Sequence, residues 1–131
     1  MIFLVDHNLE GHALLLSGTL ANQSWLDLVP IHFTTFKEIA LSITSDDRIV
    51  WRFAQANQMI LLTANRSMKG PNSLEQVIRE ENTSTSLPVV TIGDANRVLT
   101  DPDYRNRCLD RLIEIVFDID DYRDTRRLFI P

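Results

Sequence analysis

The side chains best suited to chemistry are carboxylates and amides that lie next to apolar segments of the chain. Those that follow apolar runs are Asp6, Asn8, Asn65 and Asp94, and those that open a segment of helical periodicity are Asp46 and Asp47. Hard divalent cations prefer oxygen ligands of this kind. Hydrolysis of a phosphodiester with such cations needs several carboxylates that converge from distant positions. The sequence predicts a centre for Mg²⁺ or Mn²⁺ that draws its carboxylates from Asp6, Asp46, Asp47 and Asp94.

These residues need a scaffold that brings distant positions together. Short apolar runs bounded by polar residues predict buried strands at 2–5, 30–33, 59–63 and 88–92, with a last edge strand at 126–130. Apolar residues at helical spacing predict helices over about residues 9–20, 35–42, 46–57, 73–81 and 102–117. Ser45 or Asp46, and later Ser73, are expected to cap the helices that follow them, because their side-chain oxygens can accept from the amides of the first turn.

Strands that alternate with helices, each strand a nearly continuous apolar run, are typical of a parallel sheet covered on both faces. The length of 131 residues suits one domain. We therefore expect an α/β fold over residues 1–131, a single-domain three-layer α/β/α sandwich with a mainly parallel, Rossmann-like central sheet. In such sheets ligands bind beyond the carboxyl ends of the strands. That edge would collect Asp6, Asn65 and Asp94 from separate strand ends, with Asp46 and Asp47 nearby.

Two blocks of sequence carry a family resemblance. They read FLVDHN at residues 3–8 and SDDRIVWRFAQANQMILLTANR at residues 45–66. As a pair they resemble PIN-like nuclease domains, in particular a short toxin-like subgroup that begins with a strand followed by Asp-Glu-Asn. In that subgroup the second block usually reads Ser-Asp, a helix with a central Ala, an apolar strand and Thr-Arg-Asp. The resemblance covers residues 1 to about 68, and it implies a metal-dependent ribonuclease that often acts as the toxin of a toxin–antitoxin pair.

The resemblance can be carried over residue by residue. The subgroup's metal-binding and polar positions fall on Asp6, Asn8, Asp46 and its neighbour Asp47. Asn65 stands where the subgroup usually has an aspartate after the strand, and His7 stands where it has Glu. Both departures remove negative charge from the implied site. The implied catalytic residues are Asp6, Asp46 and Asn65, and the expected substrate-binding residues are Asn8 and Arg66.

Each of these residues also has a purely structural interpretation. A carboxylate at the start of a helix can cap it or interact with the helix dipole, which applies to Asp6, Asp46, Asp47 and Asp94. Asn65 can be a turn residue that tolerates a left-handed backbone. Arg48 and Arg52 lie four residues apart on one helix face, so they can bind phosphate or pair with carboxylates on a solvated surface.

The composition bounds the class of protein. It is 44% hydrophobic and 24% charged, as in soluble globular proteins, and no apolar run reaches the roughly 18 residues that a membrane span needs. The only cysteine, Cys108, excludes an internal disulfide and suits a reducing compartment. We therefore expect a cytoplasmic protein without a membrane partner, with Cys108 in its core. The net charge of -5 argues against strong non-specific binding of nucleic acid, although a local basic rim is compatible with it.

Two hypotheses of different classes follow. The first is a Mg²⁺- or Mn²⁺-dependent ribonuclease, with RNA as substrate and an antitoxin protein as a candidate partner. The second is a catalytically reduced PIN-like domain that binds protein or RNA, which the departures at His7 and Asn65 favour. A receiver-like or nucleotide-binding domain is disfavoured, because no glycine-rich phosphate loop follows any strand and no acidic pair joined to a lysine is apparent. The long C-terminal helix and the edge strand also leave a homodimer open.

Overall fold

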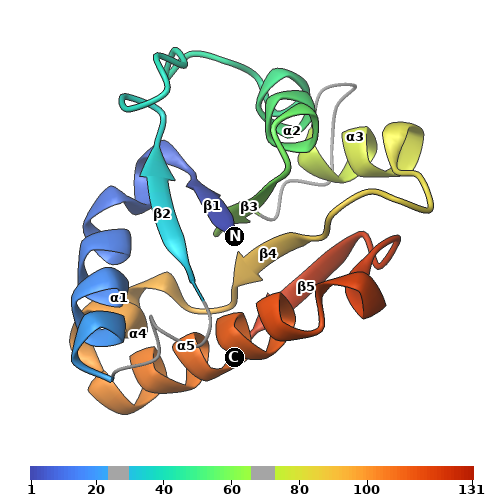
Figure 1. Ribbon diagram of the computed structural model, residues 1–131. Coiled ribbons are helices and arrows are strands. Elements are labelled where there is room, and N and C mark those ends of the chain that lie inside the picture. Colours follow the sequence, from blue (N-terminus) through green and yellow to red (C-terminus); the bar gives the residue numbers. More distant parts are fainter. Residues whose placement is uncertain (24–29, 66–72) are drawn as a thin grey trace.

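The computed structural model describes residues 1–23, 30–65 and 73–131, which form a five-stranded sheet with helices on both of its faces (Figure 1). The strands are β1 (Ile2–Val5), β2 (His32–Thr35), β3 (Met59–Thr63), β4 (Val89–Ile92) and β5 (Arg127–Ile130). The helices are α1 (Glu10–Asn22), α2 (Asp47–Ala56), α3 (Leu74–Glu81), α4 (Ala95–Thr100) and α5 (Pro102–Phe117). Short 3₁₀ turns, η1 (His7–Leu9) and η2 (Ile119–Tyr122), follow β1 and α5.

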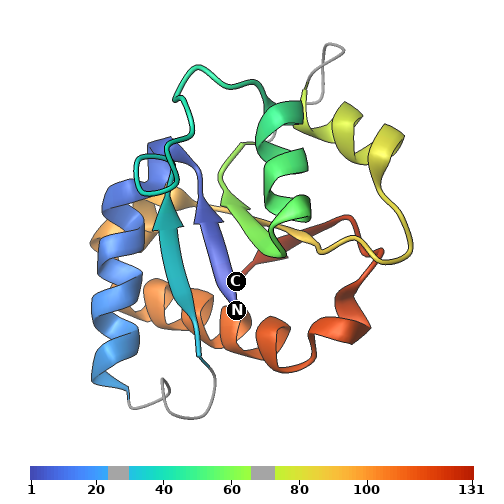
Figure 2. The ribbon, with the colours of Figure 1, turned by 45° about the horizontal axis from the view of Figure 1, so that its top comes forward.

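Every described strand is parallel to its neighbours, and the strand order is β2-β1-β3-β4-β5. The register places Leu4 beside Leu61 and Leu62 beside Val90. Figure 2 shows β1 and β2 side by side with their arrowheads pointing the same way. Nearly continuous apolar strands are what a parallel sheet buried on both faces requires. The predicted α/β sandwich with a mainly parallel sheet is confirmed.

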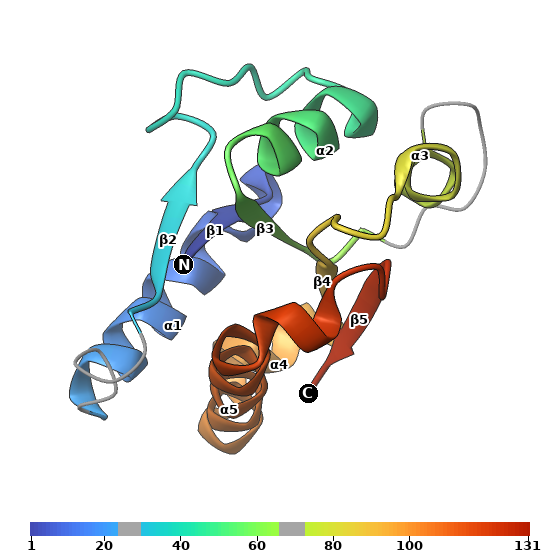
Figure 3. The same cartoon turned by 45° about the vertical axis from the view of Figure 1, so that its right-hand side comes forward.

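Each face of the sheet carries its own core, because successive residues of a strand point to opposite sides. One face buries Phe3 and Ile60 beneath α1, α4 and α5. The other face buries Leu4 and Leu61 beneath α2 and α3. Figure 3 shows α2 and α3 on one side of the sheet and α4 and α5 on the other. The sheet is therefore the middle of three layers.

The expected helix caps form at α2 and α3. Oδ1 of Asp46 accepts a hydrogen bond from the backbone N–H of Ile49 at 2.9 Å, and the hydroxyl of Ser73 accepts from that of Gln76 at 3.3 Å. Each bond satisfies an amide of the first turn that has no partner within its helix. The start of α2, which lies within the second block of the family resemblance, is thus fixed by Asp46.

The segment after β2 differs from the prediction. The strand lies at residues 32–35 rather than 30–33, and the helix expected over 35–42 is wrong. A turn takes its place, closed by a hydrogen bond of 2.8 Å from the backbone N–H of Leu41 to the carbonyl oxygen of Phe36. Ala40 has a φ of 57°, which is incompatible with a continuing right-handed helix. The turn buries the ring of Phe36 in the core beside α2.

Residues 95–100 form α4, a helix that the sequence pattern did not predict. Only Val98 of this six-residue helix is buried. A single inward residue produces no helical periodicity, which explains why the sequence pattern did not predict the helix.

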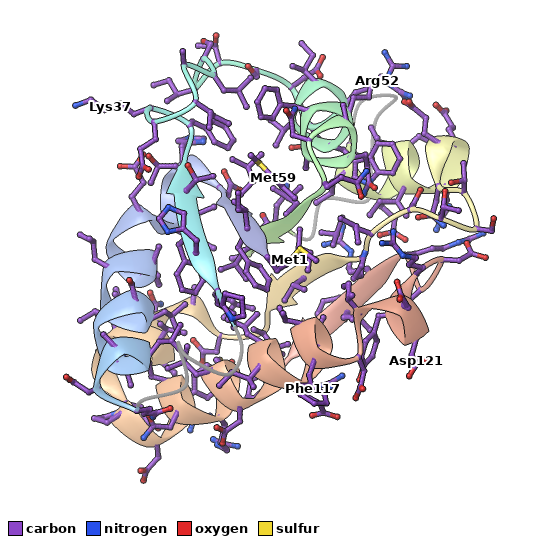
Figure 4. The ribbon with its side chains drawn as sticks, in the orientation of Figure 1. Met1, Lys37, Arg52, Met59, Phe117 and Asp121 are labelled. Atoms are coloured by element: carbon purple, nitrogen blue, oxygen red, sulfur yellow. The ribbon has the colours of Figure 1, made fainter. Side chains whose placement is uncertain are left out.

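The longest described helix, α5, has 16 residues and packs Cys108 into the core, as predicted. At its end Phe117 points away from the sheet (Figure 4) and is 73% exposed. Among the described helices, none combines the length and the apolarity that crossing a membrane requires.

Candidate functional site

The order of the strands marks one place on the sheet as a ligand site. β2 lies on one side of β1 and β3 on the other. The chain therefore moves from β1 to β2 in one direction across the sheet and then crosses back past β1 to reach β3. In doubly wound sheets the crevice at such a reversal, beyond the carboxyl ends of the strands, is where ligands bind. A pocket of about 140 Å³ lies there. Its polar lining comes from Asp6, His7, Asn8, Ser45, Asp47, Thr63 and Asn65, and its apolar wall from Phe36, Val50, Leu61 and Leu74.

Asp6 enters the pocket from the end of β1 and is fixed by β3. Its backbone N–H donates to the carbonyl oxygen of Leu62 at 2.9 Å, and the hydroxyl of Thr63 donates to its Oδ2 at 2.9 Å. Thr63 is only 1% exposed, so the second bond is shielded from water. Asp6 precedes η1, but its side chain makes no capping hydrogen bond to that turn. The carboxylate is therefore oriented by β3 rather than by the turn that follows it.

Asp47 enters the same pocket from the first residue of α2. Its Oδ2 accepts a hydrogen bond of 3.0 Å from the side-chain Nδ2 of Asn65. The backbone N–H of Asn65 in turn donates to the hydroxyl oxygen of Thr63 at 2.9 Å. Asn65 does not adopt the left-handed backbone that a simple turn residue would favour. Thr63 and Asn65 therefore connect the two carboxylates of the pocket.

The electrostatics of the pocket disfavour the ionised form of Asp47. Burial raises the pKa of the Asp47 carboxyl above its ordinary value, and the charges of Asp6 and Asp46 raise it further. Hydrogen bonds from the side chain of Asn65 and from the backbone of Leu74 act in the opposite direction, and burial remains the largest effect. A cation in the pocket would stabilise the ionised carboxylate of Asp47 and so offset the unfavourable effects of its burial and of the repulsion from Asp6.

His7 lies beside Asp6 at the edge of the pocket. Its Nδ1 is 3.2 Å from Oδ1 of Asp6, and its ring centroid is 5.8 Å from that of Phe36. An imidazole therefore lies beside Asp6 at the position where the resemblance to the PIN-like subgroup implies a further carboxylate.

Of the four carboxylates that the sequence predicts for the site, the structure places two, Asp6 and Asp47, at the pocket. Asp46 is an exposed helix cap and does not line the pocket. Asp94 caps α4 by accepting from the backbone N–H of Arg97 at 3.3 Å, and its own backbone N–H donates to the hydroxyl oxygen of Tyr104 at 2.8 Å. The structural interpretation of both residues as helix caps therefore agrees with their contacts.

The remaining predicted site residues are placed as follows. Asn8, on η1, is exposed and lines the pocket. Arg66 falls outside the described residues. Arg48 contacts Glu80 and Glu81 of α3, and Nε of Arg52 lies 2.7 Å from Glu81, on the outer side of α2 (Figure 4). Both arginines thus follow the solvated-surface interpretation.

The oxygen donors of the pocket fit a single hard cation that takes only a few of its ligands from the protein. Within the described part of the chain, no three His, Cys, Asp or Glu side chains are grouped so that they could hold a metal ion. The two carboxylates at the pocket are nevertheless oxygen donors from different elements. Mg²⁺ is commonly held by one or two carboxylates while water fills its remaining positions. The pocket is therefore compatible with a Mg²⁺-type ion and lacks the larger carboxylate set that the sequence predicted.

Thr63 is the site residue that the sequence reasoning missed. It lies two positions before Asn65, and its hydroxyl contacts both Asp6 and Asn65. The sequence did contain an indication of its role, because Thr63 is a polar residue at the end of an otherwise apolar strand. Strand residues two apart point to the same face, so Thr63 could have been expected on the same side as Asn65. No protein-family model, curated protein or solved structure matches the chain. The resemblance to PIN-like nucleases therefore depends on the two sequence blocks alone.

Proposed function

We propose that this chain is a divalent-metal-dependent ribonuclease whose cation, Mg²⁺ or Mn²⁺, is held by Asp6 and Asp47. One observation carries the proposal: two carboxylates from distant parts of the chain line one pocket at the reversal point of the sheet. The raised pKa of Asp47 supports it, because burial and Asp6 leave a carboxyl that a bound cation would stabilise in its ionised form.

Each residue of the pocket has a role in this proposal. The cation, when bound, supplies an activated water and stabilises negative charge on the attacked phosphate. Asp6 and Asp47 hold the cation, while Thr63 orients Asp6 and Asn65 orients Asp47 through the hydrogen bonds described above. Asn8 lies at the pocket, where it can contact the substrate. Arg66, which follows Asn65 in the sequence, stays a prediction as a phosphate contact.

The choice of RNA as substrate is supported by the resemblance of residues 3–8 and 45–66 to PIN-like nucleases. A cytoplasmic location agrees with the free thiol of Cys108. An antitoxin partner and a homodimer are also implied by the resemblance or by the elements near the C-terminus, and both stay predictions.

The test is Mn²⁺ binding by calorimetry together with RNA cleavage on the same samples. The variants are Asp6→Asn and Asp47→Asn, and the matched control is Asp46→Asn. Asn is as good a helix cap as Asp, so the control removes a neighbouring charge while it preserves the start of α2. We expect Mn²⁺ binding and EDTA-sensitive cleavage by the wild type, loss of both in the two pocket variants, and retention of both in the control.

Two results would contradict this proposal. Absence of both Mn²⁺ binding and cleavage in the wild type would show that the pocket does not work as a metal centre. An equal loss of Mn²⁺ binding and cleavage in Asp46→Asn and Asp47→Asn would show that the carboxylate in the pocket contributes no more to metal binding than the exposed helix cap does. Either result would remove the structural basis for a cation held by Asp6 and Asp47.

A second candidate is a catalytically reduced PIN-like domain that acts as a binding module. The hydrogen bond from Asn65 to Asp47 favours it, because an amide donor occupies a carboxylate oxygen where the resemblance expects a further acid. Under this alternative Asn65→Asp would create Mn²⁺ binding and RNase activity that the wild type lacks. Cleavage by the wild type that disappears in Asp6→Asn would exclude the alternative.

A further inference from the structure

Arg127 is a buried arginine at the first position of β5. Its side chain is only 8% exposed, whereas arginine heads normally stay in water. Nε donates to Oε2 of Glu75 at 3.2 Å, and Nη1 donates at 2.7 Å both to the hydroxyl oxygen of Thr91 and to the backbone carbonyl oxygen of Asn65. These acceptors belong to α3, to β4 and to the segment after β3. A buried cation needs such partners, and here they tie three elements together.

The contact with Asn65 links Arg127 to the acidic pocket, which Arg127 itself does not line. Asn65 is the residue whose side-chain amide donates to Asp47 and whose backbone N–H donates to Thr63. Thr63 in turn donates to Asp6. Arg127 therefore holds the backbone of a residue that donates directly to Asp47 and that is connected to Asp6 through Thr63.

We propose that Arg127 is a positioning residue that sets the geometry of the acidic pocket through Asn65. Holding the carbonyl of Asn65 against β4 fixes where its side-chain amide lies, and thereby the orientation of the Asp47 carboxylate. A guanidinium is suited to this role because its planar fork directs donors at several acceptors at once, which a lysine ammonium on a flexible stem does not. The expected effect on metal affinity rests on the proposed function, whereas the link from Arg127 to Asn65 and Asp47 does not.

The first measurement is made on the full chain without metal. In Arg127→Met, we expect the NMR resonances of the Asn65 side-chain amide to move away from their wild-type positions, because the amide no longer lies against Asp47. The matched control is Arg79→Met, since Arg79 also contacts Glu75, at 3.9 Å, but donates no hydrogen bond to Asn65. The control removes the same charge and should leave the Asn65 amide unchanged. An unmoved Asn65 amide in Arg127→Met would overturn the proposal.

The second measurement is the affinity of the same proteins for Mn²⁺. Loss of a residue that orients a metal ligand typically weakens binding roughly 10–100-fold, and we expect a change of that size in Arg127→Met and none in Arg79→Met. A moved amide with wild-type Mn²⁺ affinity would overturn the positioning role. If the wild type binds no Mn²⁺, the proposed ribonuclease fails, and the Asn65 amide alone decides whether Arg127 orders the pocket.

Arg127→Lys is the variant to use if Arg127→Met does not fold. It keeps the charge and a donor but cannot span the acceptors on α3, β4 and Asn65 together. We expect a smaller displacement of the Asn65 amide and a weaker Mn²⁺ affinity than in the wild type. Wild-type values for both would overturn the proposal.

Discussion

The side-chain amide of Asn65 donates a hydrogen bond of 3.0 Å to Oδ2 of Asp47, and this bond balances the pocket when no cation is present. Asp47 is a partly buried carboxylate close enough to Asp6 for their charges to interact. A neutral donor reduces the cost of that arrangement, whereas an aspartate at position 65 would increase it. The amide therefore favours a pocket that is stable without metal over one with maximal negative charge.

Asn65→Asp should make stability depend on metal. The change replaces a donor to Asp47 with a like charge, so we expect a loss of about 1–3 kcal/mol in the free energy of unfolding in EDTA at neutral pH. Mn²⁺ should recover more stability in this variant than in the wild type, because a cation relieves the added repulsion. Chemical denaturation with EDTA or with MnCl₂ measures both effects.

Asn82→Asp is the matched control for that prediction. The side-chain amide of Asn82 also donates to a carboxylate, Oδ1 of Asp124 at 2.7 Å, but this pair is exposed and lies outside the pocket. Its effect should be smaller and insensitive to Mn²⁺. Equal responses of the two variants to Mn²⁺ would contradict the role given to the pocket.

Asp47→Asn should stabilise the protein without metal, and the gain should grow with pH. The pKa of Asp47 is raised in the folded state above its ordinary value of 3.8, so the folded state binds the proton more tightly than the unfolded state does. The resulting stability is present at low pH and is lost as the pH rises through the folded pKa. An uncharged asparagine at position 47 escapes that loss and can still accept from Asn65.

Denaturation in EDTA at pH 4 and pH 7 tests this dependence. Asp103→Asn is the control, because Asp103 lies in the first turn of α5 as Asp47 does in α2, but is exposed. A gain for Asp47→Asn that is the same at both pH values, or a loss that grows with pH, would contradict the prediction.

The strand ends were predictable from the sequence because each depends on a local pattern. The apolar runs at residues 2–5 and 59–63 define β1 and β3, and parallel strands place Asp6 and Asn65 at one edge. Which of Asp46 and Asp47 faces the pocket was harder to predict from the sequence. Adjacent helix residues point about 100° apart, so the exact start of α2 decides which of the two faces the pocket. The side chain of Asp46 sets that start by accepting a hydrogen bond from the first turn of α2, so Asp46 acts as the helix cap.

Two other features depend on tertiary contacts that no local pattern contains. Asp94 was expected at the site because it follows β4, but the short helix α4 requires it as a cap. Arg127 read as part of an edge strand, and nothing in its neighbourhood indicated acceptors as distant in sequence as Asn65 and Thr91. The sequence thus predicted the edge of the sheet that carries the pocket, but not the contacts that select and orient its members.

Thr63→Val should destabilise the fold more than its small change in shape suggests. Valine removes the donor to Asp6 and the acceptor for the backbone N–H of Asn65, so buried polar groups lose their partners. Such losses cost about 1–3 kcal/mol. Thr34→Val is the control, because Thr34 is also a buried strand residue but its hydroxyl makes a longer contact, 3.4 Å to Glu38. Urea denaturation of both variants should show the larger loss for Thr63→Val, and equal losses would contradict the importance of Thr63.

The thiol of Cys108 should react only when the protein unfolds. Cys108 lies on the buried side of α5, and its burial raises the pKa of the thiol to about 11, so at pH 8 the thiol is un-ionised as well as inaccessible. Because the thiolate is the reactive form, we expect no reaction of the native protein with Ellman's reagent and one equivalent of reaction in denaturant. A Cys108→Ala/Asp110→Cys double variant places a thiol at an exposed position on the same helix and should react without denaturant. Rapid labelling of native Cys108 at the rate of the exposed thiol would mean that α5 opens from the sheet readily, which its buried contacts with the core do not predict.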